Sequence, residues 1–230
     1  MRETLSETLR VRPTRPTSDA VVFVIDHDEA ARGDLKRLLE SLGLQVLFFQ
    51  SAVEFLNSTL PEKTSCLLFA LPMPGMSGLK LQEELAKAKV PVPVVFITGH
   101  PDIAIAVRAM KAGAVDFLAK PVRDQDLLDA VFAALERDRV RHEHEASLSA
   151  LREQFNSLTT REREVLLRVA AGRLNKQIAA ELGVSEVMVK VHRANGIRKI
   201  HAKSVAELVR MSDLLQGEAL PKAAAPDCSR

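Results

Sequence analysis

Short apolar runs alternate with longer amphipathic segments through the first half of the chain. The runs are rich in β-branched residues, which is typical of strands buried on both faces of a parallel sheet. The expected strands are 20–25, 44–49, 66–71, 92–97 and 115–118. The expected helices between them are 29–42, 51–58, 79–88 and 103–112. This alternation predicts an α/β domain with a flavodoxin-like, doubly wound parallel sheet and right-handed crossovers.

The region after the last expected strand has a helical pattern that changes character along its length. No glycine or proline occurs from Asp124 to Arg152, and an apolar stripe over 127–135 gives way to a polar stretch over 137–145 before Leu148 resumes the stripe. We expect one long helix that leaves the first domain and becomes a solvated or dimer-forming connector. A terminal helix followed by a flexible linker is the alternative.

The rest of the chain is expected to be all helical. Thr159 and Glu162 have the spacing of a capping box, and Gly183 separates two short helices as in a helix-turn-helix. Ser204 begins a last helix that runs to about Leu215. The predicted organisation is a flexible arm (1–18), an α/β domain (19–123), a terminal helix and connector (124–154), a helical domain (155–216) and a disordered tail (217–230).

Charge is distributed unevenly along the chain. Basic and acidic residues number 11 and 11 in 20–123, 4 and 8 in 124–154, and 11 and 6 in 155–215. Only the last segment is therefore expected to meet a polyanion, with a solvated charged face as the alternative. Cys66 and Cys228 lie far apart, and the chain has neither an apolar signal core nor an apolar run that could cross a membrane. We expect a cytoplasmic protein without disulfides and without a membrane partner.

Five positions follow the carboxyl ends of the expected strands, where the functional crevice of an open parallel sheet forms. They are Asp26, His27, Ala70, Thr98 and Lys120. Together with the loop Met73-Pro-Gly-Met-Ser-Gly78 and the pair Lys120-Pro121, this pattern resembles the receiver domains of bacterial two-component response regulators.

That resemblance implies a switch whose chemistry has been lost. In such receivers two acids after the first strand and an aspartate in the third strand hold Mg²⁺, the aspartate accepts a phosphoryl group, and the threonine and lysine contact the phosphoryl oxygens. Asp26 matches the first acid, but His27 stands at the second and Ala70 at the acceptor. A methyl group cannot be a nucleophile, and Mg²⁺ needs hard oxygen ligands. We therefore expect a degenerate receiver with no phosphorylation, no metal and no cofactor. The departures at His27 and Pro72 favour natural degeneration over one engineered change, and a transition-metal site of His27 with Asp26 and Asp28 is the disfavoured alternative.

The helical domain resembles the LuxR family of helix-turn-helix proteins. The resemblance rests on Leu158-Thr-Thr-Arg-Glu-Arg-Glu-Val-Leu166, on Asn175-Lys-Gln-Ile-Ala179, and on Val189-Lys-Val-His-Arg-Ala-Asn195, which points to the FixJ-like branch. It implies a recognition helix in the major groove of double-stranded DNA. The candidate DNA-binding residues are Asn175, Lys176, Lys190, Val191, Arg193, Ala194, Arg198, Lys199 and Lys203.

Three further expectations concern the recognition helix itself. Val187 and Val191 are expected to face the domain core, so that Val191 is counted both there and among the DNA-binding candidates. Met188 and Ala194 could touch a thymine methyl group. Gly196, which costs about 1 kcal/mol against alanine inside a helix, is expected to bend the helix or to relieve contact with the last helix.

The two resemblances together imply a FixJ-like DNA-binding transcription regulator that acts without phosphorylation as a homodimer on palindromic sites. The candidate dimerisation residues are Ile103, Val107, Val205, Leu208 and Val209. The alternative is an interaction protein that antagonises a phosphorylatable regulator by heterodimerising, and a sensor protein is a further candidate partner. An enzyme is disfavoured because the chain has no glycine-rich phosphate loop and no complete acid–base set.

Overall fold

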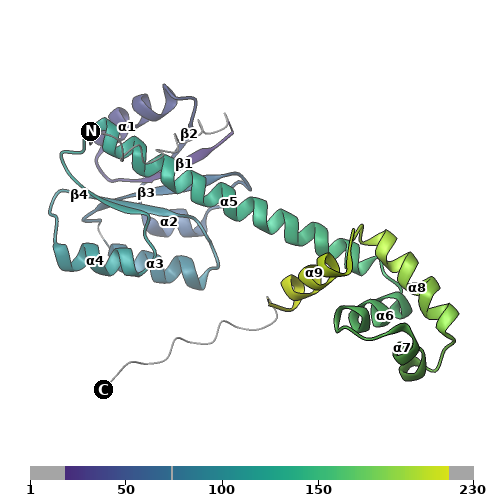
Figure 1. The fold of residues 1–230 in the computed structure, drawn as a ribbon. Coiled ribbons are helices and arrows are strands. Elements are labelled where there is room, and N and C mark those ends of the chain that lie inside the picture. The colour runs from purple at the N-terminus through teal and green to yellow at the C-terminus, as the bar shows by residue number, and fades with distance from the viewer. Residues whose placement is uncertain (1–18, 74, 218–230) are drawn as a thin grey trace, which may run out of the picture. The chain divides into compact units, whose positions relative to one another are not determined.

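The described part of the chain folds into two compact units that are divided between His142 and Glu143. The computed structural model describes residues 19–73 and 75–217 (Figure 1). The arm predicted for residues 1–18 lies outside the described residues, as does the tail predicted for 217–230 except for its first residue.

The first unit is built on a parallel sheet of five strands in the order β2-β1-β3-β4-β5 (Figure 1). All neighbouring strands pair in parallel. The strands are β1 (Val21–Ile25), β2 (Gln45–Phe49), β3 (Ser65–Leu71), β4 (Val94–Thr98) and β5 (Asp116–Ala119). The predicted doubly wound fold is confirmed. Each strand begins and ends within two residues of the predicted positions.

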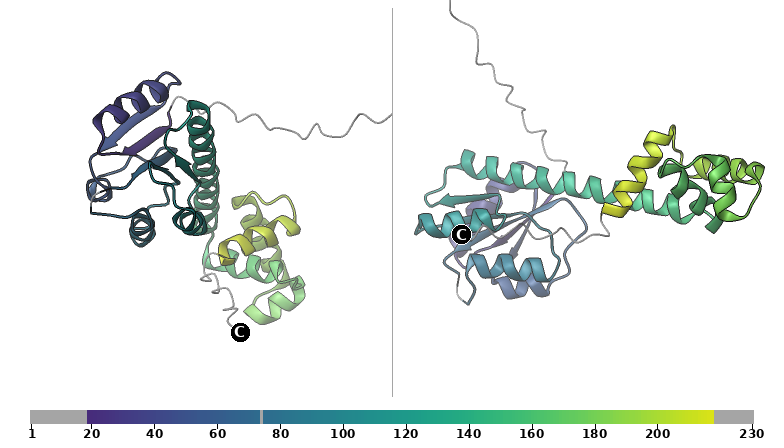
Figure 2. Two further views of the ribbon diagram at one scale, coloured as in Figure 1. Left: turned by 90° about the vertical axis from the view of Figure 1, so that its left-hand side faces the viewer. Right: turned by 60° about the horizontal axis from the view of Figure 1, so that its bottom comes forward.

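Helices cover both faces of this sheet (Figure 2). The helices are α1 (Glu29–Glu40), α2 (Ala52–Asn57), α3 (Gly78–Lys87), α4 (Ile103–Lys111) and α5 (Asp124–Asn156). On one face, Leu39 of α1 and Val131 of α5 pack against β1, β3 and β4. On the other face, Phe55 of α2, Leu81 of α3 and Ala109 of α4 pack against the same strands. Because the central strands are buried on both faces, their sequences are apolar without alternation.

Helix α5 is continuous over 33 residues, so the predicted long helix is confirmed. Its first part contributes Leu127, Val131 and Leu135 to the core of the first unit. Its last part contributes Leu151 and Phe155 to the core of the second unit. The second core thus begins at Leu151, four residues before the expected start of the helical domain.

A buried carboxylate lies within the stretch of α5 that was expected to be solvated. Asp138 is fully buried, and its Oδ2 accepts a hydrogen bond of 2.8 Å from the backbone N–H of Ser65, the first residue of β3. Its Oδ1 pairs with the Arg141 guanidinium at 2.8 Å, and His142 lies 3.4 Å from its Oδ2. The packing of α5 on the sheet therefore continues past its apolar stripe and ends in a polar cluster.

The second unit contains four further helices around its own core. They are α6 (Thr160–Ala170), α7 (Asn175–Leu182), α8 (Glu186–Lys199) and α9 (Val205–Gly217). The capping box is confirmed: Glu162 N–H donates to Thr159 Oγ1, and Thr159 N–H donates to Glu162 Oε2 at 2.9 Å. Gly183, in the left-handed conformation at φ 65°, ends α7 and makes the turn to α8. Within residues 19–73 and 75–217, no helix is both long and apolar enough to cross a membrane.

Candidate functional site

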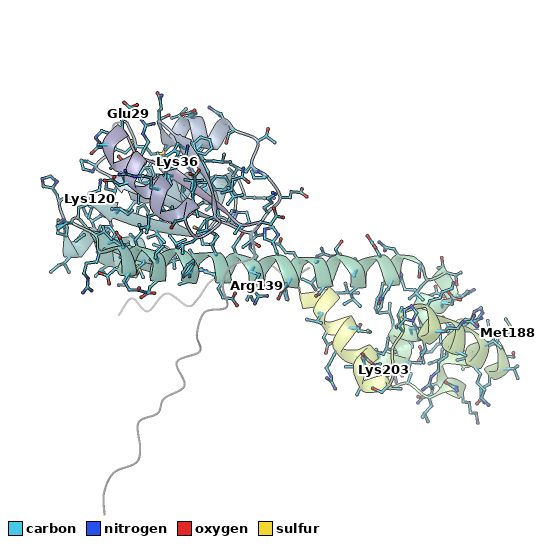
Figure 3. All side chains as sticks on the ribbon, turned by 90° about the horizontal axis from the view of Figure 1, so that it is seen from above. Glu29, Lys36, Lys120, Arg139, Met188 and Lys203 are labelled. Carbon is cyan, nitrogen blue, oxygen red and sulfur yellow. The ribbon has the colours of Figure 1, made fainter. Side chains whose placement is uncertain are left out.

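The carboxyl ends of β1, β3, β4 and β5 bring the predicted receiver residues together. Asp26 directly follows β1 and is 2 % exposed. Its Oδ1 accepts a 2.9 Å hydrogen bond from the Asp28 N–H, and its Oδ2 lies 3.4 Å from Lys120 Nζ. Lys120, at one end of the first unit in Figure 3, therefore has a carboxylate partner from its own domain.

Of the two residues that follow Asp26, His27 is exposed, and Asp28 lines the same cleft as Asp26 and Lys120. His27 Nδ1 lies 3.8 Å from Asp26 Oδ1, but the His27 side chain is 56 % exposed. The Asp28 carboxylate caps α1 by accepting from the N–H groups of Ala30 and Ala31 at 3.0 and 3.3 Å. In the described parts of the chain, no group of three or more His, Cys, Asp or Glu side chains could hold a metal ion.

Position 70 lies in β3, the strand between β1, which leads to Asp26, and β4, which ends at Thr98. Ala70 is buried and pairs in register with Ile97, and the next residue pairs with Thr98. The Thr98 hydroxyl accepts from the His100 N–H at 3.1 Å and donates to the His100 carbonyl at 3.3 Å. The backbone of Lys120 is also fixed, because its N–H donates to the Thr98 carbonyl at 2.7 Å. The structure therefore brings all five predicted receiver residues to one edge of the sheet, with a methyl group where the acceptor carboxylate is expected.

Helix α4 presents apolar side chains on the surface of the first unit. Ile103 is 84 % exposed and Val107 is 46 % exposed, and both lie on the same helix as exposed Ile105 and Met110. Only Ala109 of this helix is buried. The two predicted dimerisation residues of α4 are thus available on the surface of their unit.

The predicted dimerisation residues of α9 are placed differently from one another. Leu208 is 1 % exposed and belongs to the core of the second unit, so it is not on a surface. Its prediction as a dimer contact is not supported by this placement. Val205 is exposed and Val209 is half-buried.

The side of helix α8 that faces the core differs from the prediction. Val187 is 68 % exposed and Val191 is 45 % exposed, whereas Val189 is fully buried. The expected core positions of Val187 and Val191 were therefore wrong. Two positions along an α-helix correspond to a rotation of about 200° around its axis. Because Val189 faces the core, Val187 and Val191 therefore face outward.

Gly196 allows close packing, although not against the helix that was expected. A Cβ added at Gly196 would lie 2.8 Å from Leu166 Cδ1 and 3.0 Å from Leu166 Cγ, and Leu166 belongs to α6. The predicted relief of contact with the last helix was therefore wrong. Gly196 lets α8 approach α6, which fixes the recognition helix on the core.

Lys199 has a partner inside the second unit. Its Nζ donates to Glu162 Oε2 at 2.7 Å, and Glu162 is almost fully buried. The Lys199 ammonium and, to a lesser extent, the Thr159 backbone N–H hold the pKa of Glu162 below its ordinary value. This pair joins α8 to the N-terminal cap of α6, a contact between positions 37 residues apart that no local sequence pattern reveals.

The other predicted DNA-binding residues lie around the exposed side of α7 and α8. Arg193 Nη1 donates to Asn175 Oδ1 at 3.2 Å, which links α8 to the N-terminus of α7. The Lys190 side chain is 63 % exposed and lies 3.6 Å from Glu186. The remaining predicted residues that are exposed in the second unit are Lys176, Ala194, Arg198 and Lys203.

Comparisons with protein families match both units. The model for the response regulator receiver domain matches residues 22–132. The model for bacterial regulatory proteins of the luxR family matches residues 156–212.

Relatives are similar to this chain over nearly its whole length. Nodulation protein W of Bradyrhizobium diazoefficiens is 50 % identical over 202 residues, which cover 88 % of this chain and 89 % of that protein. Transcriptional regulatory protein FixJ of Azorhizobium caulinodans is 43 % identical over 205 residues, which cover 89 % of this chain and 97 % of that protein.

Solved structures of such proteins are also similar to this chain. The response regulator StyR has a TM-score of 0.76 at 45 % identity, and the match covers 85 % of this chain and 99 % of StyR. Full-length FixJ from B. japonicum has a TM-score of 0.52 at 36 % identity, and the match covers 87 % of this chain and 98 % of FixJ.

Proposed function

This chain belongs to the FixJ-like response regulators, which join a receiver domain to a LuxR-family DNA-binding domain. From that premise we propose that it regulates transcription without aspartyl phosphorylation. The premise is carried by the 43 % identity to FixJ of Azorhizobium caulinodans, together with the receiver and luxR-family matches. A regulator that binds DNA acts where the DNA is, which for a bacterial protein is the cytoplasm.

The observation that carries the proposal is the side chain at position 70. Phosphoryl transfer to a receiver needs a carboxylate nucleophile at this place, and Ala70 supplies only a buried methyl group. The nearby Asp28 carboxylate does not stand at this place: it follows β1, and its Oδ1 caps α1. The unmodified protein is therefore the active form in this proposal.

The electrostatics of the cleft support the same reading. Asp26 is the one carboxylate of the family's acidic set that this chain keeps, and Lys120 neutralises it at 3.4 Å. Mg²⁺ is usually bound through carboxylates and keeps near-octahedral geometry. Mg²⁺ must lose bound water molecules to enter a site, and a single carboxylate that is already paired with a lysine replaces few of those interactions.

We further propose that the protein acts as a homodimer. The apolar side chains of α4 that are exposed on the first unit are those that a protein partner would bury. Two DNA-binding units related by a two-fold axis would then recognise a palindromic site. The alternative occupant of this α4 surface is a related, phosphorylatable regulator, whose activity this chain would antagonise by forming a heterodimer.

The proposal is tested with full-length protein and a double variant, His27→Asp with Ala70→Asp, which rebuilds the acidic set. Both proteins are incubated with Mg²⁺ and acetyl phosphate, their masses are measured, and their affinity for DNA selected from a random pool is compared before and after treatment. We expect the unmodified wild type to bind selected DNA as a dimer and to gain no phosphoryl group. A wild-type protein that gains a phosphoryl group, or binds DNA only after treatment, would contradict the proposal. Binding only as a mixed dimer with a second regulator would favour the alternative.

A further inference from the structure

A cavity lies at the amino end of the sheet in the first unit. Its volume is about 420 Å³, which is within the usual range for sites that bind small molecules. Its walls come from the second half of α3, the start of β4, the turn after α4 and the middle of α5. Because the strands are parallel, this cavity lies at the opposite edge of the sheet from the cleft of Asp26 and Lys120.

The floor of the cavity is apolar. Leu85 of α3 and Val94 of β4 are buried there, and both belong to the core on the α2, α3 and α4 face of the sheet. Val90 and Val92, which precede β4, are half-buried and pack against the same core. All four residues line the cavity. Because covering apolar surface is favourable, this floor suits the apolar body of a small molecule.

Two guanidinium groups are held at the cavity wall. Arg137 Nη1 donates to the Gly113 carbonyl at 3.2 Å, and both residues line the cavity. Arg141 Nη2 donates to Asp138 Oδ1 at 2.8 Å, and both of these residues line it as well. A guanidinium has five N–H donors, so the bond to Gly113 holds Arg137 in place and allows a further partner.

The charge of the lining favours an anion. The charged residues that line the cavity are Arg137, Arg141 and Asp138, which give two positive charges and one negative. The negative charge is already paired, because the Asp138 carboxylate bonds to Arg141. Residues 85–94, which run along the cavity from α3 to β4, contain no Asp or Glu. A carboxylate also matches the planar guanidinium group in geometry, since the two can form parallel hydrogen bonds.

The walls are held together without a bound molecule. Gln82 of α3 lines the cavity, and its Nε2 donates to the Ala109 carbonyl of α4 at 3.2 Å. Asp138 is anchored on the sheet by the backbone N–H of Ser65. A cavity whose walls are already fixed loses little conformational freedom when a ligand binds.

We propose that this cavity binds a small organic anion, a carboxylate with an apolar body, whose charged group pairs with Arg137. The site gives the first unit a chemical signal that does not involve position 70. Ala112 and Gly113, which line the cavity, directly follow α4. A bound molecule therefore contacts the end of the helix that carries the exposed apolar residues.

NMR of valine and leucine methyl groups in the full-length protein locates the binding. The probe is cyclohexanecarboxylate, and the comparison compound is cyclohexanecarboxamide, which has the same ring and no charge. We expect the carboxylate to shift the methyl signals of Leu85, Val90 and Val92. The carboxamide should bind about tenfold more weakly, because hydrogen bonds between charged groups are stronger than those with a neutral acceptor.

Variants assign the contacts. Arg137→Gln removes the charge and should weaken carboxylate binding about tenfold, with little effect on the carboxamide. Ala86→Leu enlarges an exposed helical side chain in the lining and should weaken the binding of both compounds. Arg139→Gln is the matched control, because Arg139 (Figure 3) lies on the same helix but does not line the cavity. The methyl spectrum of each variant shows in the same experiment whether the first unit is folded.

Three results would overturn the proposal. The first is the absence of shifts at Leu85, Val90 and Val92 with millimolar carboxylate. The second is a set of shifts confined to the second unit, which would mean that the anion binds the basic DNA-binding unit instead. The third is equal carboxylate affinity of Arg137→Gln and Arg139→Gln. DNA plays no part in this experiment, so each of these results leaves the proposed function intact.

Discussion

Replacing Gly196 by alanine tests how the recognition helix is fixed to the core. In an exposed helix the change stabilises by about 1 kcal/mol, because glycine loses more backbone entropy on folding. At position 196 the new Cβ would lie 2.8 Å from Leu166 Cδ1 and 3.0 Å from Leu166 Cγ, and Leu166 is fully buried. Forcing an extra methyl group into a packed core costs about 1–3 kcal/mol. We therefore expect a net loss of about 1 kcal/mol and weaker DNA binding, as α8 moves away from α6.

The matched control is Gly33→Ala in α1 of the first unit. A Cβ at Gly33 has no heavy atom within 4 Å, so this change should give the ordinary helical gain of about 1 kcal/mol. The chain contains no tryptophan or tyrosine, so intrinsic fluorescence is a poor probe of unfolding. Urea-dependent hydrogen exchange serves better, because it reports the amides of α1 and α8 separately.

A double-mutant cycle decides whether Leu166 is the cause. In a Leu166→Ala background the cavity left by the leucine accepts the new methyl group, so Gly196→Ala should become stabilising by about 1 kcal/mol. An equal loss in both backgrounds would refute the contact between Gly196 and Leu166 as the reason for a glycine in the recognition helix.

Three further variants test other contacts. The Lys199 ammonium lowers the pKa of Glu162 below 4.5, so the stabilisation from this pair is complete above that value and is lost as pH falls through the lowered pKa. Glu162→Gln should remove this acid-dependent part of the second unit's stability in urea unfolding between about pH 7 and about pH 3. Asp138→Ala should destabilise the first unit by about 2–3 kcal/mol, seen as faster hydrogen exchange in β3, because it breaks a buried ion pair and leaves a buried N–H unpaired. Ile103→Glu should shift the protein from dimer to monomer in analytical ultracentrifugation without loss of helix content, whereas the exposed Val53→Glu should not; an unchanged dimer would exclude α4 as the contact.

The elements of both units followed from the sequence because each has a strong local pattern. The β1 run is apolar throughout, the β3 run is apolar from Cys66 to Leu71, and the capping pair Thr159 and Glu162 marks the start of α6. The sheet topology then brought Asp26, Ala70 and the other receiver residues to one edge without any further information.

The rotation of α8 about its axis did not follow, because valines alternate at positions 187, 189 and 191. A helix cannot bury all three, and local sequence does not say which side faces the core. Gly196 and Ile200 held the missing information, since both are buried and lie seven and eleven residues after Val189, on the same side of the helix. A glycine inside a helix, interpreted as a site of close approach, would have selected Val189.

Contacts between segments far apart in the chain were also missed. Asp138 lies in a run of charged residues and has the pattern of a solvated helix face, yet it is buried against Ser65, 73 positions earlier. Lys199 was grouped with the DNA-binding residues, and the structure shows that it pairs with Glu162. Such pairs depend on tertiary packing, and charge patterns along the sequence cannot distinguish them from solvated side chains.

The receiver residues that this chain retains each form hydrogen bonds or ion pairs with other residues of the first unit. Asp26 accepts from the Asp28 N–H and from Lys120, and the Thr98 hydroxyl fixes the loop at His100. These bonds stabilise the ends of β1 and β4 whether or not a phosphoryl group is ever present. The presence of Asp26, Thr98 and Lys120 is therefore no argument for phosphoryl transfer. The chemistry depends on the side chain at position 70, where a buried methyl group offers no nucleophile.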